Sequence, residues 1–147
     1  MKTINKQLQE IKGLSAAYMH NNSKKWLSEL EFVKDEELFF DDLIKSYTLQ
    51  LIGPKHFEKS KEYVDKLSKL HKKTEKLIRM VKSHERKLKI MVDAIEQPRE
   101  EESYREDHEW LSKSIDQFFI KYNIFKTKLF KLIKSILKEQ KQKLLLQ

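Results

Sequence analysis

Apolar residues recur at alternating spacings of three and four along two long stretches of the chain. The first ladder consists of Tyr63, Leu67, Leu70, Thr74, Leu77, Val81, His84, Leu88, Met91 and Ile95. The second consists of Tyr104, His108, Leu111, Ile115, Phe118, Tyr122, Phe125, Leu129, Leu132 and Ile136. Because this spacing keeps one side of a helix against a partner over many turns, the ladders predict a long antiparallel, coiled-coil-like hairpin. A turn between Glu96 and Arg99 would place Ile95 beside Tyr104 and Tyr63 beside Ile136.

A third apolar seam precedes the hairpin and consists of Trp26, Leu30, Val33, Phe40, Ile44, Tyr47 and Leu51. Gly53 and Pro54 suit the end of one helix and the first turn of the next, and Pro98 suits another start. We therefore predict an all-α antiparallel bundle of three long helices over about 23–52, 55–96 and 99–145. Folding back at Gly53 would set Glu37 level with His71.

The first helix is too short to cover the whole hairpin. At 1.5 Å per residue it would span about 45 Å, against roughly 60 Å for the second helix. We expect a short N-terminal helical segment, residues 1–20 of a single domain 1–147, to cover the hairpin tip. Self-association into a homodimer is the alternative, through an association patch made of Met91, Ile95, Tyr104 and Trp110.

Composition supports a helical protein and excludes thiol chemistry. The chain has 147 residues, 37% of them charged, with two Gly, two Pro and no Cys. This excludes disulfides, thiolate metal sites and a Cys nucleophile. There is no apolar run of about 18 residues and no signal-peptide core, so we expect a cytoplasmic protein without a transmembrane segment.

The formal charge of +8 is distributed unevenly. Residues 53–95 and 111–147 each carry +7, whereas 96–110 carry −5 and 22–52 carry −3. One helical face near the end collects Lys121, Lys128, Lys131, Lys134, Lys138 and Lys141. Such a face could bind nucleic acid, another polyanion or anionic lipid, or it could simply be the solvated side of the hairpin.

Polar residues on or beside the seams are the candidates for chemistry. Glu37, His71 and Glu75 are candidate metal ligands, since carboxylates and His from facing helices build metal sites in bundles. The simpler interpretation, which we favour, is a hydrogen bond or ion pair between Glu37 and His71. We expect no cofactor and no metal.

Arg79 and His84 form the second candidate, within the run Arg79-Met80-Val81-Lys82-Ser83-His84. This run resembles the Arg-x4-His motif of HEPN-type ribonucleases. The resemblance covers six residues and implies His84 as an acid or base in RNA cleavage, with Arg79 contacting phosphate. Met80 departs from the family, which usually has a polar residue there.

These observations favour a non-enzymatic helical-bundle interaction or adaptor protein, acting on a protein partner or on itself. The first alternative is a nucleic-acid or polyanion binder that uses the Lys-rich helices. A HEPN-like ribonuclease is the second alternative.

Overall fold

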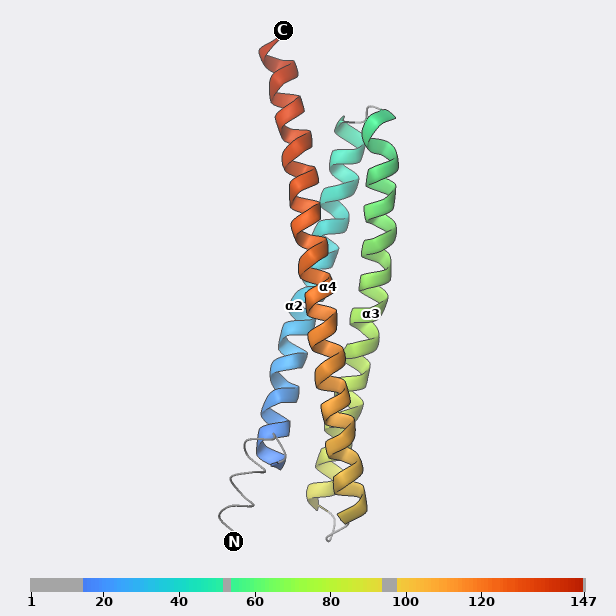
Figure 1. Ribbon diagram of the computed structural model, residues 1–147, viewed down its shortest axis with the longest axis vertical. Coiled ribbons are helices and arrows are strands. Elements are labelled where there is room, and N and C mark those ends of the chain that lie inside the picture. Colours follow the sequence, from blue (N-terminus) through green and yellow to red (C-terminus); the bar gives the residue numbers. More distant parts are fainter. Residues whose placement is uncertain (1–14, 52–53, 94–97, 147) are drawn as a thin grey trace. The chain divides into compact units, whose positions relative to one another are not determined.

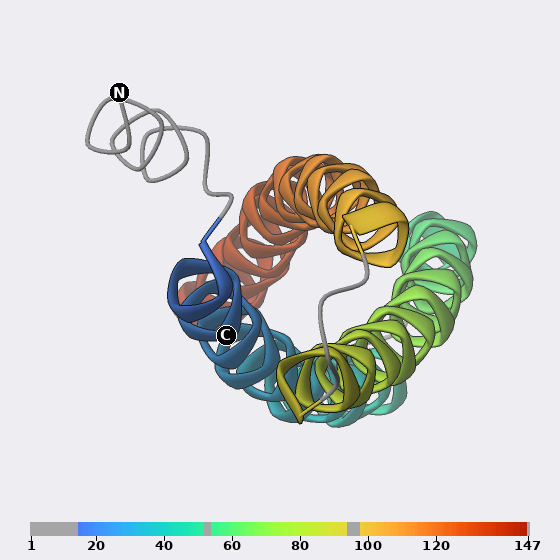
Figure 2. The same ribbon diagram turned by 90° about the horizontal axis from the view of Figure 1, so that it is seen from below.

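The computed structural model describes residues 15–51, 54–93 and 98–146, with side chains over 15–47, 57–91 and 99–146. It contains three helices, α2 (Ala16–Leu51), α3 (Pro54–Asp93) and α4 (Pro98–Leu145). Figures 1 and 2 show them as continuous ribbons that lie beside one another. The helices pack together as an all-α bundle, as the sequence predicted. None of the described helices is long and apolar enough to cross a membrane.

The predicted starts of α3 and α4 agree with the structure, but α2 starts earlier than expected. It begins at Ala16 rather than near residue 23. The hydroxyl of Ser15 accepts a hydrogen bond from the backbone N–H of Tyr18 at 3.2 Å, which is the geometry of a helix N-cap. Ser23, near the predicted start, is buried within the helix.

The bundle divides into two compact units, and each unit takes one segment from each helix. Unit 1 comprises Met1–Phe32 and Glu75–Asp116, and unit 2 comprises Val33–Thr74 and Gln117–Gln147. Residues 1–14 lie outside the described part, so their predicted role as a cover for the tip is not seen.

The core of unit 1 joins the start of α2 to the facing parts of α3 and α4. Met19 packs against Leu88 and Tyr104, and Met91 lies at the edge of this cluster. The first turns of α2 therefore cover apolar side chains near the end of α3. The other buried apolar residues of unit 1 are Trp26, Leu30, Leu77, Ile78, Val81, Leu111 and Ile115.

Aromatic contacts link the helices of unit 2. Phe40 of α2 meets the ring of Phe130 of α4 edge-on at a centroid distance of 5.6 Å. Tyr63 of α3 meets Phe125 of α4 at 5.8 Å. The buried apolar residues are Val33, Phe40, Ile44, Leu67, Phe118, Tyr122, Phe125, Leu129, Ile133 and Ile136.

The two ladders meet in a different register from the predicted one. Tyr63 contacts Phe125 rather than Ile136, and the ring of His84 stacks on Tyr104 at 3.9 Å. A heptad ladder still matches apolar to apolar after a slip of seven residues, so the apolar pattern alone could not fix this alignment. The fold-back of α2 on α3 is as predicted, because Glu37 lies opposite His71.

Candidate functional site

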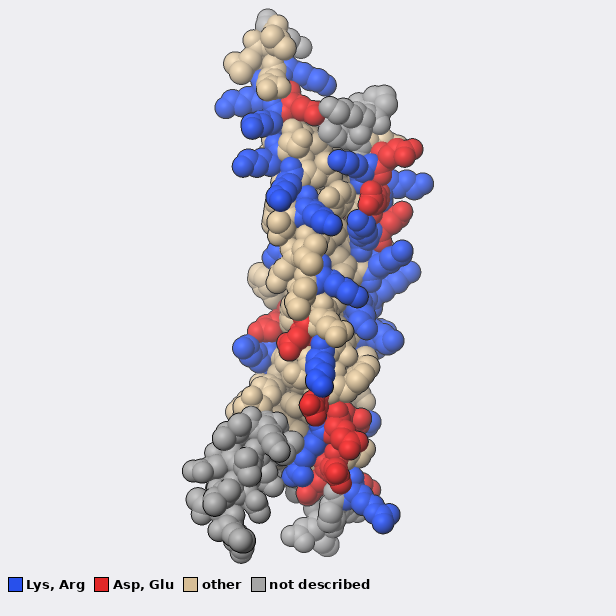
Figure 3. Space-filling view, in the orientation of Figure 1, with Lys and Arg blue, Asp and Glu red and all other residues tan. Residues whose placement is uncertain are grey.

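A Lys-rich surface lies on the α4 segment of unit 2. We define it as Lys121, Lys128, Lys131, Lys134, Lys138 and Lys141, all of which are exposed on α4. Figure 3 shows Lys and Arg side chains gathered around the C-terminal part of α4. Unit 2 holds seventeen Lys against nine acidic residues, whereas unit 1 holds fourteen basic and fourteen acidic residues. The whole formal excess of +8 therefore belongs to unit 2.

A groove of about 340 Å³ lies between α3 and α4 beside this surface. It combines three ammonium groups with a half-buried aromatic ring and one carboxylate. Its lining residues are Lys59, Tyr63, Lys128, Lys131, Leu132, Ser135 and Glu139. Two of the predicted lysines, Lys128 and Lys131, therefore line a groove. Lys59 of α3 contributes a third cation to the same groove.

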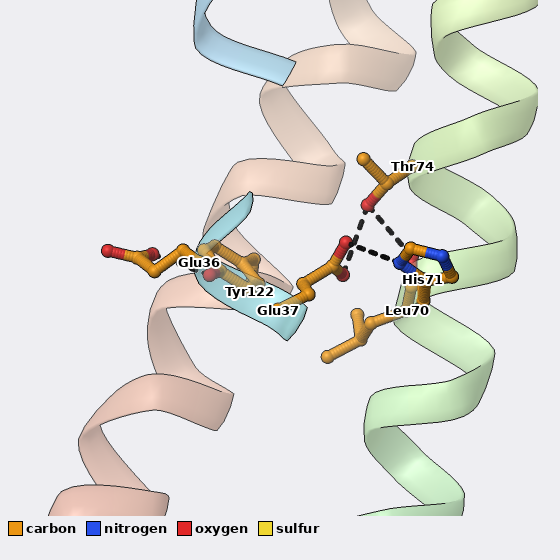
Figure 4. Close-up of polar contacts among 6 residues, drawn as sticks. All are labelled: Glu36, Glu37, Leu70, His71, Thr74 and Tyr122. Atoms are coloured by element: carbon orange, nitrogen blue, oxygen red, sulfur yellow. Dashed lines mark hydrogen bonds and ion pairs between the residues drawn. The ribbon is translucent and has the colours of Figure 1, made fainter. Parts of the chain in front are cut away.

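Glu37 is the most deeply buried acidic side chain in unit 2, with 1% of its surface exposed. Its carboxylate accepts a hydrogen bond from the Thr74 hydroxyl at 3.1 Å and lies 3.3 Å from Nδ1 of His71 (Figure 4). The Thr74 hydroxyl also lies 2.9 Å from the carbonyl oxygen of Leu70. The predicted pairing of Glu37 with His71 is confirmed.

The third candidate metal ligand, Glu75, belongs to unit 1 and is half-buried. Over the described residues, no three His, Asp or Glu side chains are grouped so that they could hold a metal ion. The geometry of Glu37 and His71 is that of a polar contact between α2 and α3.

A second polar network lies beside Glu37 and was not predicted from the sequence. The buried Tyr122 hydroxyl donates to Glu36 at 2.5 Å, and the Lys126 ammonium lies 2.9 Å from the same carboxylate oxygen. In Figure 4, Glu36 and Glu37 point in opposite directions, toward α4 and α3 respectively. Burial raises the pKa of Tyr122, and the hydrogen bond to Glu36 raises it further. The only sequence signal was two adjacent acids beside an apolar seam.

Two imidazoles form the polar centre of unit 1. Nε2 of His84 lies 2.9 Å from Nδ1 of His108, and both rings are buried. Tyr104 stacks on His84, and Trp26 stacks on His108 at a centroid distance of 4.6 Å. Burial, together with the neighbouring His108 and Lys87 charges, lowers the pKa of His84 to about 4. Burial lowers the pKa of His108 to about 4.

Further polar groups surround this pair. The Asn22 amide lies 3.4 Å from Nε2 of His108, and His20 Nδ1 lies 2.7 Å from Glu85. Three buried oxygens have no hydrogen-bond partner in the described part of the chain: Ser23 Oγ, Glu85 Oε1 and the Tyr104 hydroxyl oxygen. The centre of unit 1 is thus an incompletely satisfied polar cluster in an apolar core.

Arg79 and His84 line one groove of about 540 Å³ between α3 and α4 of unit 1. Arg79 is exposed on its wall, whereas His84 is 5% exposed and has Nε2 engaged with His108. The structure therefore brings the two motif residues to one groove. The ribonuclease resemblance stays a prediction.

The residues of the predicted association patch have different environments. Tyr104 is buried and Met91 is half-buried against it, whereas Trp110 is 58% exposed. Ile95 lies outside the described residues. Tyr104 and Trp110 therefore do not form one exposed surface, because Tyr104 is covered by side chains of its own chain.

Comparison with known proteins adds no relationship to this geometry. No protein-family model, no curated protein and no solved structure matches the chain.

Proposed function

We propose that the protein is a non-enzymatic interaction module that binds nucleic acid through the Lys-rich surface of unit 2. The observation that carries this proposal is the concentration of the entire charge excess in that unit, beside a groove with three lysines. Phosphate backbones are bound mainly by exposed cations, which release counterions from the nucleic acid.

The lysines are available for such contacts. Within the described part of unit 2, none of the six lysines of the Lys-rich surface forms an ion pair, whereas Lys126 is paired with Glu36. Their ammonium groups are therefore exposed and not held in close ion pairs. A partner with closely spaced negative charges would gain the most from this arrangement.

The residue type indicates the kind of recognition. Unit 2 contains no Arg; all four Arg residues of the chain lie in unit 1. Lys acts as a compact point charge, while bidentate reading of guanine is mostly done by Arg. We therefore propose binding to phosphates without preference for base sequence.

The test is an electrophoretic mobility shift with duplex DNA and single-stranded RNA at several salt concentrations. In the test variant, Lys59, Lys128 and Lys131 are all replaced by Glu. The control variant replaces Lys24, Lys82 and Lys89, which are exposed in unit 1, by Glu and has the same net charge.

We expect the unit 2 variant to bind at least about ten-fold more weakly and to show a flatter salt dependence, with a slope reduced by about 2. The control variant should stay close to wild type. Equal losses in both variants would show that only net charge matters, and an absence of wild-type binding at low salt would refute the proposal.

A further inference from the structure

The groove of unit 1 that holds Arg79 and His84 has two chemically different walls. The α3 wall carries basic residues, and the α4 wall carries an indole, an acid and an aliphatic side chain. The lining residues are Lys76, Arg79, Met80, Ser83, His84 and Lys87 from α3, with Asp107, Trp110 and Leu111 from α4. Its volume of about 540 Å³ lies in the range of small-ligand pockets.

The basic wall is not neutralised. In the described part of the chain, Lys76, Arg79 and Lys87 form no ion pair, and one carboxylate, Asp107, lines the groove with them. Unit 1 as a whole has balanced charge, so this local excess belongs to the groove itself. Arg79 adds a planar guanidinium, which can hold two oxygens of one phosphate.

Trp110 supplies an accessible aromatic ring on the opposite wall. It is 58% exposed, whereas the other tryptophan of the chain, Trp26, is 8% exposed and stacked on His108. An indole in a basic groove is well suited to stack on a planar ring, and base–aromatic stacking tolerates any base.

We propose that this groove binds a nucleotide unit, with the base stacked on Trp110 and the phosphate held by Arg79, Lys76 and Lys87. The inference goes beyond the proposed function, because it uses no residue of the Lys-rich surface and does not require that surface to bind. The nucleotide unit comes either from a free mononucleotide or from a single-stranded nucleic acid.

A second groove of about 260 Å³ continues along α3 and α4 and supplies space beyond one nucleotide. It shares Lys87 and Asp107 with the first groove. Its other lining residues are Ile90, Met91, Glu100, Ser103 and Tyr104. A strand could follow this path, while a mononucleotide would need only the first groove.

The binding experiment uses the full chain carrying Trp26→Phe, so that fluorescence reports Trp110 alone. The probes are AMP, adenosine, ribose 5-phosphate and a six-nucleotide oligoadenylate RNA. We expect saturable quenching by AMP or by the RNA, at least ten-fold weaker binding of adenosine, and no quenching by ribose 5-phosphate. Quenching by AMP identifies a free nucleotide as the ligand, and quenching by the RNA alone identifies a strand.

Calorimetric titration of groove variants then tests the assignment. Trp110→Ala should weaken binding by at least about five-fold, Trp110→Phe should weaken it less, and Arg79→Ala should weaken it by at least about ten-fold. Lys82→Ala, on the same helix but outside the groove lining, should bind like wild type.

Two results would overturn the inference. One is the absence of Trp110 quenching by both AMP and the RNA. The other is RNA binding that is lost in the Lys59, Lys128 and Lys131 variant but unchanged by Trp110→Ala and Arg79→Ala, which would leave the proposed function intact. Conversely, AMP binding by wild type together with unchanged mobility shifts in the unit 2 variant would refute the proposed function alone.

Discussion

His84 and His108 share a hydrogen bond of 2.9 Å between Nε2 and Nδ1 in the core of unit 1. One ring must donate and the other accept, so the bond requires at least one neutral imidazole. The pair also lies between two aromatic side chains, because Tyr104 stacks on His84 and Trp26 stacks on His108. The pair therefore links α3 to α4 by a contact that depends on protonation.

Acid should destabilise the fold through this pair. The folded-state pKa values of His84 and His108, each about 4, lie below the ordinary value of 6.5. The unfolded chain therefore takes up protons first, so stability is greatest above about pH 6.5 and is lost as the pH falls toward 4. We expect the free energy of unfolding, measured with urea, to fall by about 1 to 2 kcal/mol per imidazole between pH 7 and pH 5.

The other groups near the pair set the control for this measurement. Lys87 contributes to the lowered pKa of His84, while Glu85 faces Tyr104 and His20. A variant carrying His84→Leu and His108→Leu retains these neighbours but lacks the pair. Its stability should change little over the same pH interval; a dependence as steep as that of wild type would show that other groups are responsible.

The same pair should select the alignment of α3 with α4. Because the chain has no Cys, introduced cysteines report the alignment without competing thiols. Leu88→Cys with Tyr104→Cys matches the observed contact, whereas Leu88→Cys with Leu111→Cys matches the alignment slipped by one heptad. We expect the first pair alone to cross-link under mild oxidation.

Replacing His84 by Ile and His108 by Leu removes the polar reason for this alignment. A single polar position can fix the register of a helical pair, and its loss permits alternatives. In this background we expect the second cysteine pair to form a measurable fraction of cross-links. If it never forms, the register is selected by other contacts.

Loss of the Glu37 carboxylate should be costly, because it removes the buried oxygen that accepts from the Thr74 hydroxyl and the oxygen beside Nδ1 of His71. We expect Glu37→Ala to lower the free energy of unfolding by about 2 to 4 kcal/mol in urea unfolding. Asp35→Ala, at an exposed position of the same helix, should change it by less than about 0.5 kcal/mol. Replacing Glu37 by Leu, His71 by Leu and Thr74 by Val together should recover most of the lost free energy of unfolding, because three apolar side chains need no hydrogen-bond partners.

Two buried tyrosines provide a matched comparison. The hydroxyl of Tyr122 donates to Glu36, whereas the hydroxyl of Tyr104 is buried without a hydrogen-bond partner in the described part of the chain. We expect Tyr122→Phe to lower the free energy of unfolding by about 1 to 2 kcal/mol. Tyr104→Phe should leave the free energy of unfolding unchanged or raise it. Thermal unfolding of the two variants side by side measures the difference, and equal losses would contradict it.

The sequence was sufficient for the helices and for one of the two helix alignments. α2 ends at Leu51 and α3 begins at Pro54, so the short interval between them limits how the two helices can be aligned, and Glu37 was correctly placed opposite His71. The hairpin of α3 and α4 repeats every seven residues, so its apolar pattern is nearly unchanged by a slip of one heptad. The observed alignment is the one that pairs His84 with His108. It can be recognised from the sequence only when the polar positions of the two ladders are matched to each other.

The candidate sites were predicted only in part. A helical wheel identified the Lys-rich surface because exposure on a helix follows directly from its period. The groove walls depend on which residues of α3 and α4 lie at the same level, and the shifted register changed that. Tyr104 and Trp110, expected in one patch, have opposite exposures because six residues along α4 place them about 120° apart around the helix.

The division of every helix between two units also determines when the fold can be completed during synthesis. Unit 1 has all of its segments once the ribosome has released the chain through Asp116, whereas unit 2 needs the part of α4 that follows. Its segment Val33–Thr74 must therefore wait, with Phe40 lacking its α4 partner Phe130. A nascent chain exposes the apolar side chains of this segment until that part of α4 has been synthesised, and this is the half that carries the positive charge excess.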